Sequence, residues 1–194
     1  MTSFYDGYFQ LENLKYYTVV SNIVFYLVVI LYLVSYLTNS NCIPNWLLYA
    51  VIVNILGVAL IGNGLYCCNY EKVYQATESV SVNTNPADIF GTLHISNFIG
   101  HTLPFLVSIV MILLIEPYAF KMSYSLAFLA AFAALWLLIP SPSGQILHNK
   151  VNEVYLDPPL TMFLLLPIVW IVFLYLIQYS QKKREQLCFE QLNQ

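Results

Sequence analysis

The chain has 194 residues, of which 59% are hydrophobic and only 9% are charged, and its net charge is −3. Because a soluble domain carries about 25% charged residues, this composition excludes a water-exposed globule and indicates a membrane protein. Only 7 residues are basic, and they are too scattered to form a nucleic-acid-binding surface.

Four stretches of the chain carry no charged side chain, and each contains apolar sequence long enough to cross a bilayer. A membrane-spanning helix takes about 20 residues. The uncharged stretches lie between Lys15 and Glu71, between Asp88 and Glu116, between Lys121 and Lys150, and between Asp157 and Lys182. The first of them is long enough to cross twice, so we expect five crossings in all.

Hydropathy predicts five spans, in chain order at residues 17–37, 46–66, 97–115, 123–139 and 160–179. These runs are continuously apolar rather than alternating, which favours helices over a barrel. We therefore expect an all-α fold, a polytopic transmembrane helical bundle of about five spans, in one integral membrane domain over residues 1–194. A short interfacial helix is predicted from Asp88, and residues 180–194 are predicted to form a polar C-terminal tail.

The basic residues predict how the chain lies in the membrane. Loops rich in Lys and Arg stay in the cytoplasm, and a cluster of Lys182, Lys183 and Arg184 directly follows the last span. We expect the C-terminus to be cytoplasmic, and five spans then place the N-terminus outside or in a lumen.

Polar residues gather at the starts of the odd-numbered spans, which all lie in the same leaflet because these spans run in the same direction. The end of the fourth span lies there too. In chain order the polar and aromatic residues at this depth are Thr18, Ser21, Asn22, Asn97, His101, Thr102, Trp136, Asn152, Tyr155 and Asp157, and Pro140 marks the end of the fourth span. Residues four apart share a helix face, which pairs Thr18 with Asn22 and Asn97 with His101. The pattern therefore predicts a hydroxyl, an imidazole, several amides and a carboxylate at one membrane depth.

Each of these groups also has a structural interpretation. Thr and Asn in membrane helices commonly join helices, at roughly 0.6 kcal/mol each, and Asp157 can cap the start of the last helix. A histidine in lipid is costly and is often functional, so His101 admits both interpretations. Pro104 frees a carbonyl in the preceding turn. The polar and small residues of the second span are interpreted as close-packing positions: Asn54, Gly57, Gly62, Asn63 and Gly64.

A hydroxyl beside a neutral imidazole is a nucleophile with a general base, and in a membrane it could attack the ester of a lipid that enters sideways. Thr18 and His101 are therefore the candidate catalytic residues. The amides of Asn22 and Asn97 can orient the base or donate to an oxyanion. The four cysteines and three histidines show no metal-ligand spacing, so we expect neither a metal ion nor another cofactor.

Three short motifs follow one another along the chain: KYYTVVSN at residues 15–22, NFIGHTLP at 97–104 and VYLDP at 154–158. In this order, they resemble motifs of the androgen-induced-gene family of multipass membrane threonine hydrolases and their bacterial relatives. The resemblance extends over most of the chain, from about residue 14 to residue 179. That family usually has six spans and its threonine motif opens the second, whereas here the motif opens the first predicted span.

The resemblance implies an activity and a set of site residues. Animal members cleave fatty acid esters of hydroxy fatty acids, so membrane lipids would be both the environment and the substrate. On the matching positions, Thr18 would be the nucleophile and His101 the base. Asn97 and Asp157 would be supporting groups.

Two other classes of function stay open at this point. A small transporter would use His101 and Asp157 in a proton or solute pathway, although such pathways normally show carboxylates within the spans, and these spans contain none. A scaffold subunit of a larger membrane complex would use Thr18 and His101 only for packing.

Overall fold

The computed structural model describes two short strands and residues 17–40, 42–68, 70–71, 74, 85–115, 120–138 and 159–192. The predicted site residue Asp157 lies outside the described residues, as do Pro140, Asn152 and Tyr155. The strands β1 (Phe4–Tyr5) and β2 (Tyr8–Phe9) pair antiparallel near the N-terminus, in a segment for which the sequence predicts no regular element.

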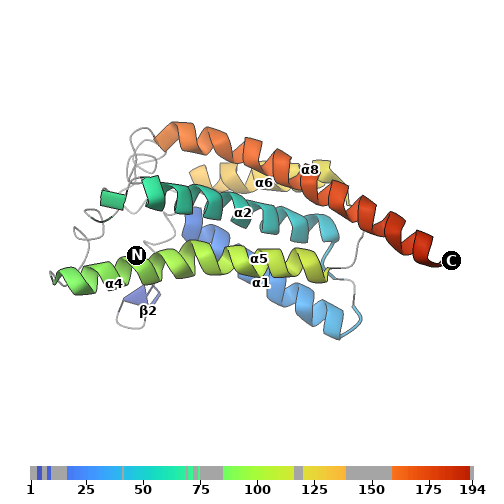
Figure 1. Ribbon diagram of the computed structural model, residues 1–194, viewed down its shortest axis with the longest axis horizontal. Helices are drawn as coiled ribbons and strands as arrows, with labels where there is room; N and C mark the ends of the chain where they lie inside the picture. Colours follow the sequence, from blue (N-terminus) through green and yellow to red (C-terminus); the bar gives the residue numbers. More distant parts are fainter. Residues whose placement is uncertain are drawn as a thin grey trace.

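The described helices form one bundle, and this confirms the predicted all-α class (Figure 1). Its members, in chain order, are α1 (Tyr17–Leu37), α2 (Asn45–Cys68), α4 (Pro86–Asn97), η2 (Phe98–Thr102), α5 (Leu103–Leu114), α6 (Met122–Leu138) and α8 (Pro159–Leu192). Four of the described helical segments are long and apolar enough to cross a membrane. The fourth predicted span, α6, is a shorter apolar helix whose 17 residues reach about 25 Å, against a hydrocarbon core of about 30 Å.

The helix α2 lies at the centre of the bundle, in contact with α1, α5, α6 and α8. Its residues 48–59 are all buried, and 67% of its most apolar window is buried, against 17–28% in the other three long helices. The outer faces of those helices carry exposed apolar side chains such as Leu27, Leu113 and Tyr175. Such a surface fits lipid, because lipid tails are as apolar as leucine.

The third span begins earlier than its apolar residues indicate. Asn85 caps α4, where its Oδ1 accepts from the N–H of Ala87 at 3.2 Å, and Pro86 occupies the first helical position, which favours helix initiation. Figure 1 shows α4 running on into α5 as one long helix, with η2 between them. The helix predicted from Asp88 is therefore continuous with the third span instead of being a separate interfacial element.

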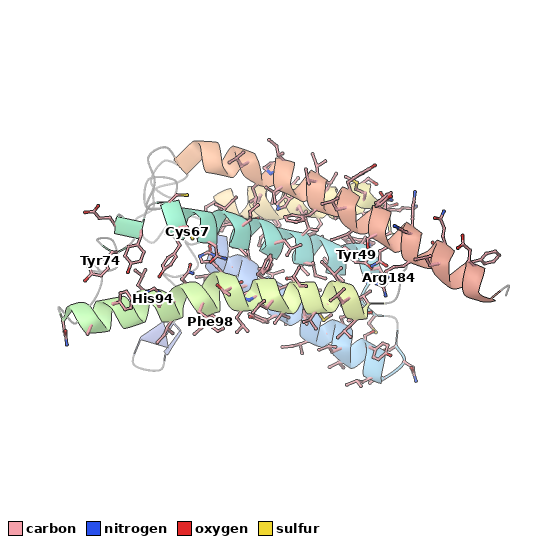
Figure 2. All side chains as sticks on the ribbon, viewed as in Figure 1. Tyr49, Cys67, Tyr74, His94, Phe98 and Arg184 are labelled. Atoms are coloured by element: carbon pink, nitrogen blue, oxygen red, sulfur yellow. The ribbon has the colours of Figure 1, made fainter. Side chains whose placement is uncertain are left out.

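The last helix, α8, extends through most of the predicted polar tail, to Leu192. Its Gln and Lys residues are good helix formers, and two side chains fasten this part to the bundle. Nε2 of Gln181 donates to the Tyr49 hydroxyl at 2.9 Å. Nη1 of Arg184 donates to the carbonyls of Ile112 and Ile115, at 3.4 and 3.3 Å, at the end of α5. Figure 2 shows Tyr49 and Arg184 at this end of the bundle.

Replacing Tyr49 by phenylalanine tests this fastening. Tyr49→Phe removes the only acceptor that the described residues offer to Gln181 Nε2, and Gln181 is 96% buried (4% exposed). We expect the free energy of unfolding, measured by denaturant titration in mixed micelles, to fall by about 1–2 kcal/mol. Tyr36→Phe, at an exposed position of α1, is the matched control. Equal stabilities of Tyr49→Phe and wild type would contradict the prediction.

Candidate functional site

His101 lies in η2, a single π turn inside the third membrane-spanning helix. The N–H of Leu103 bonds to the carbonyl of Phe98, five residues earlier, where an α-helix would bond four residues earlier. Such π turns are frequent at functional sites, because the extra residue widens the turn and alters the direction of its side chains.

Pro104 determines how α1 is joined to this turn. Because proline has no N–H, it cannot donate to the carbonyl four residues earlier, which is that of Gly100. Asn22 of α1 takes this role, and its Nδ2 donates to the Gly100 carbonyl at 2.9 Å. The carbonyl that the sequence predicts to be freed by Pro104 thus accepts a hydrogen bond from another helix.

Thr18 lies one turn before Asn22 on α1 and approaches the same glycine. A Cβ placed on Gly100 would lie 3.9 Å from the Thr18 methyl carbon Cγ2, which is ordinary van der Waals contact. The start of α1 therefore lies against the residue that precedes His101, as the shared membrane depth of Thr18, Asn22 and His101 predicts.

The imidazole of His101 faces α2. It lies so close to Gly62 that a Cβ at that position would overlap the ring atoms. Its Nδ1 is buried and has no partner among the residues that the structure describes. Within those residues, no hydrogen bond joins His101 to Thr18, since the ring points to α2 and the threonine belongs to α1.

The predicted supporting residue Asn97 also bonds to α2. Its Nδ2 donates to Oδ1 of Asn63 at 3.1 Å, and the hydroxyl of Thr102 donates to the same oxygen at 3.5 Å. The sequence assigns Asn63 to close packing, whereas in the structure it is the shared acceptor of two side chains. Asn97 therefore acts on the π turn through Asn63, and none of its hydrogen bonds in the described structure reaches His101.

A second group of buried polar side chains fixes the start of α1. The Tyr17 hydroxyl donates to Asn54 Oδ1 at 2.8 Å, and Asn54 Nδ2 donates to Ser21 Oγ at 2.9 Å. The Tyr17 ring packs edge-on against Trp136 of α6, with 5.2 Å between ring centroids. The end of the fourth predicted span thus meets the start of the first. Thr18 lies between Tyr17 and Ser21, whose side chains are both held by these contacts.

His94 lies in α4, which precedes the π turn of His101, and its surroundings differ from those of His101. It is exposed, and its Nδ1 is hydrogen-bonded to the Tyr66 hydroxyl. The centroid of its ring lies 4.0 Å from the ring centroid of Phe90. Figure 2 shows His94 toward the end of the bundle opposite Tyr49 and Arg184. Among the described residues, no group of three or more His, Cys, Asp or Glu side chains is placed to bind a metal ion.

Comparison with protein-family models finds no match to this chain, and comparison with curated proteins and with solved structures finds none either. The resemblance noted in the sequence therefore stays a prediction. The long apolar helices around an enclosed α2 identify the chain as a multi-span helical membrane protein.

Proposed function

We propose that this protein is an intramembrane lipid ester hydrolase in which Thr18 is the nucleophile and His101 the general base. The observation that supports the proposal is the meeting of α1 with the π turn at Gly100. Asn22 bonds the Gly100 carbonyl at 2.9 Å, and the Thr18 methyl group approaches the same residue. The threonine that carries the hydroxyl is thereby held against the turn that carries His101, whose side chain is half-buried. Fatty acid esters of hydroxy fatty acids are the proposed substrates.

The contacts of the imidazole suit a base. A general base needs a nitrogen with an unused lone pair, and a neutral imidazole has one nitrogen that donates and one that accepts. The ring rests on Gly62 of α2, and its Nδ1 has no partner in the described part of the chain. A proton on Nε2 would leave Nδ1 free to accept the hydroxyl proton of Thr18.

The proposed reaction has two steps. As Thr18 Oγ1 attacks the ester carbonyl carbon, His101 takes its proton, and the tetrahedral intermediate then expels the alcohol, which receives that proton. The acyl group is now esterified to Thr18. Water attacks this ester with His101 again as base, which releases the carboxylic acid and restores the hydroxyl. Asn22 uses one amide hydrogen on Gly100, and its second one can donate to the oxyanion.

Proton transfer requires the hydroxyl oxygen and the ring nitrogen to come within about 2.6–3.2 Å. The ring lies on Gly62, so the proposal includes a rotation of the His101 side chain toward α1 during the reaction. Catalytic hydrogen bonds commonly tighten only in the substrate complex.

Activity-based labelling tests the proposed function. A lipid-like fluorophosphonate probe should label the wild-type protein in detergent, and mass spectrometry should locate the adduct on Thr18. Labelling should be lost in Thr18→Ala and in His101→Ala at equal expression. Thr38→Ala is the matched control, because Thr38 is an exposed threonine at the other end of α1. Absence of labelling in a well-folded wild-type protein would overturn the proposal and favour a transport or scaffold role.

A further inference from the structure

We infer that Asn63 and Gly62 of α2 are positioning residues, which hold η2 in its π form and direct the His101 ring. The ring geometry stands on the structure alone, while the catalytic consequence rests on the proposed function. Asn63 and Gly62 are neighbouring residues of the enclosed helix α2, and the sequence assigns them only to packing.

Asn63 can bond both of its partners only because the turn between them is a π turn. The partners, Asn97 and Thr102, are five residues apart and donate to one oxygen at 3.1 and 3.5 Å. In an α-helix of 3.6 residues per turn, residues five apart point about 140° away from each other. In a π turn they are joined by the i to i+5 hydrogen bond and lie on one side. The Asn63 carbonyl oxygen, which has two lone pairs, therefore favours the π form over the α form.

Gly62 provides the space into which this turn directs the ring. Any side chain at this position would overlap the His101 imidazole, so the ring can rest there only because residue 62 is a glycine. Gly64, two residues later on the same helix, has no atom of the described residues within 4 Å of the position of a Cβ. Of these two glycines, only the one that faces His101 is required to be a glycine by a side chain packed against it.

Two consequences follow for His101. Without the Asn63 acceptor, the turn loses the contact that distinguishes π from α, and relaxation to an α turn would rotate the His101 side chain away from α2. With a methyl group on residue 62, the ring is displaced even when the π turn persists. Both changes take the imidazole out of the position from which it turns toward Thr18, and a misplacement of about 1 Å can lower the turnover number by on the order of 100-fold.

The test follows His101 by nitrogen NMR in full-length protein labelled with [15N]histidine in detergent micelles, and it measures lipid-ester hydrolysis on the same samples. The chain has three histidines, and His101→Gln assigns the signal. We compare Gly62→Ala and Asn63→Leu with wild type. Gly64→Ala is the control for a methyl group on the same helix, and Asn63→Asp restores an acceptor oxygen.

We expect the ring nitrogen signals of His101 to shift in Gly62→Ala and Asn63→Leu and to stay in place in Gly64→Ala, with recovery in Asn63→Asp. The turnover number should fall in the two shifted variants while KM stays unchanged. Unshifted signals in Asn63→Leu, a substitution of similar volume, would overturn the inference even if Gly62→Ala failed to fold. Shifted signals in a protein whose wild type hydrolyses no lipid ester would support the positioning and overturn the hydrolase.

Discussion

Thr18→Val should abolish lipid-ester hydrolysis while leaving the fold intact. Valine keeps the methyl group that lies near Gly100 and removes the hydroxyl that would carry the acyl group. Loss of a catalytic nucleophile lowers turnover by on the order of 10³-fold or more, because what remains comes only from substrate binding and oxyanion stabilisation. The measurement is the initial rate of hydrolysis of a fatty acid ester of a hydroxy fatty acid in mixed micelles.

Thr18→Ser is the matched control for this prediction, since it keeps the hydroxyl and removes the methyl contact. It should retain substantial activity, and any loss should come from weaker packing of α1 against Gly100. Together the two variants separate the hydroxyl from the packing role. Full activity in Thr18→Val would rule out Thr18 as the nucleophile and leave only the structural interpretation of this residue.

Trp136→Ala should cause the largest loss of stability, about 3–5 kcal/mol in the free energy of unfolding. The side chain is only 2% exposed, and it packs edge-on against Tyr17 at 5.2 Å between ring centroids. Its truncation leaves a cavity between α6 and the start of α1, which the surrounding helices can fill only in part. Denaturant titration in mixed micelles measures the effect.

The neighbouring residue of α6 supplies the control for Trp136→Ala. Leu135 is 63% exposed, so Leu135→Ala removes side-chain atoms that face outward and should leave the free energy of unfolding nearly unchanged. The difference between the two variants isolates burial from helix propensity. A Trp136→Ala protein as stable as Leu135→Ala would show that this contact between α6 and α1 does not support the bundle.

The spans themselves could be predicted from the sequence, because about 20 uncharged apolar residues suffice to define a crossing. Their ends could not be predicted as well. Residues 180–192 are polar, yet they continue α8, since good helix formers need no lipid to stay helical and Gln181 and Arg184 bond to the bundle. In the same way, α4 begins at a cap formed by Asn85 and Pro86, well before the apolar run.

The membrane depth of the candidate site residues could also be predicted, but the direction in which their side chains point could not. Shared direction places Thr18, Asn22 and His101 in one leaflet, and Asn22 does reach the turn of His101. Depth leaves the facing direction of a side chain open, and the π turn changes that direction for His101. The sequence could also have placed Asn63 near the candidate site, because the end of the second span lies in the same leaflet as the start of the first.

The enclosure of α2 has a consequence for the order in which the protein is made. Membrane helices insert one by one and then associate, and α2 is synthesised before α5, α6 and α8, which later cover it. Asn54 finds its partners Tyr17 and Ser21 on α1 at once, whereas Asn63 must wait for Asn97 and Thr102. A nascent chain that stops after its second helix therefore already contains the threonine-bearing half of the candidate site, and the arrival of the third helix completes it.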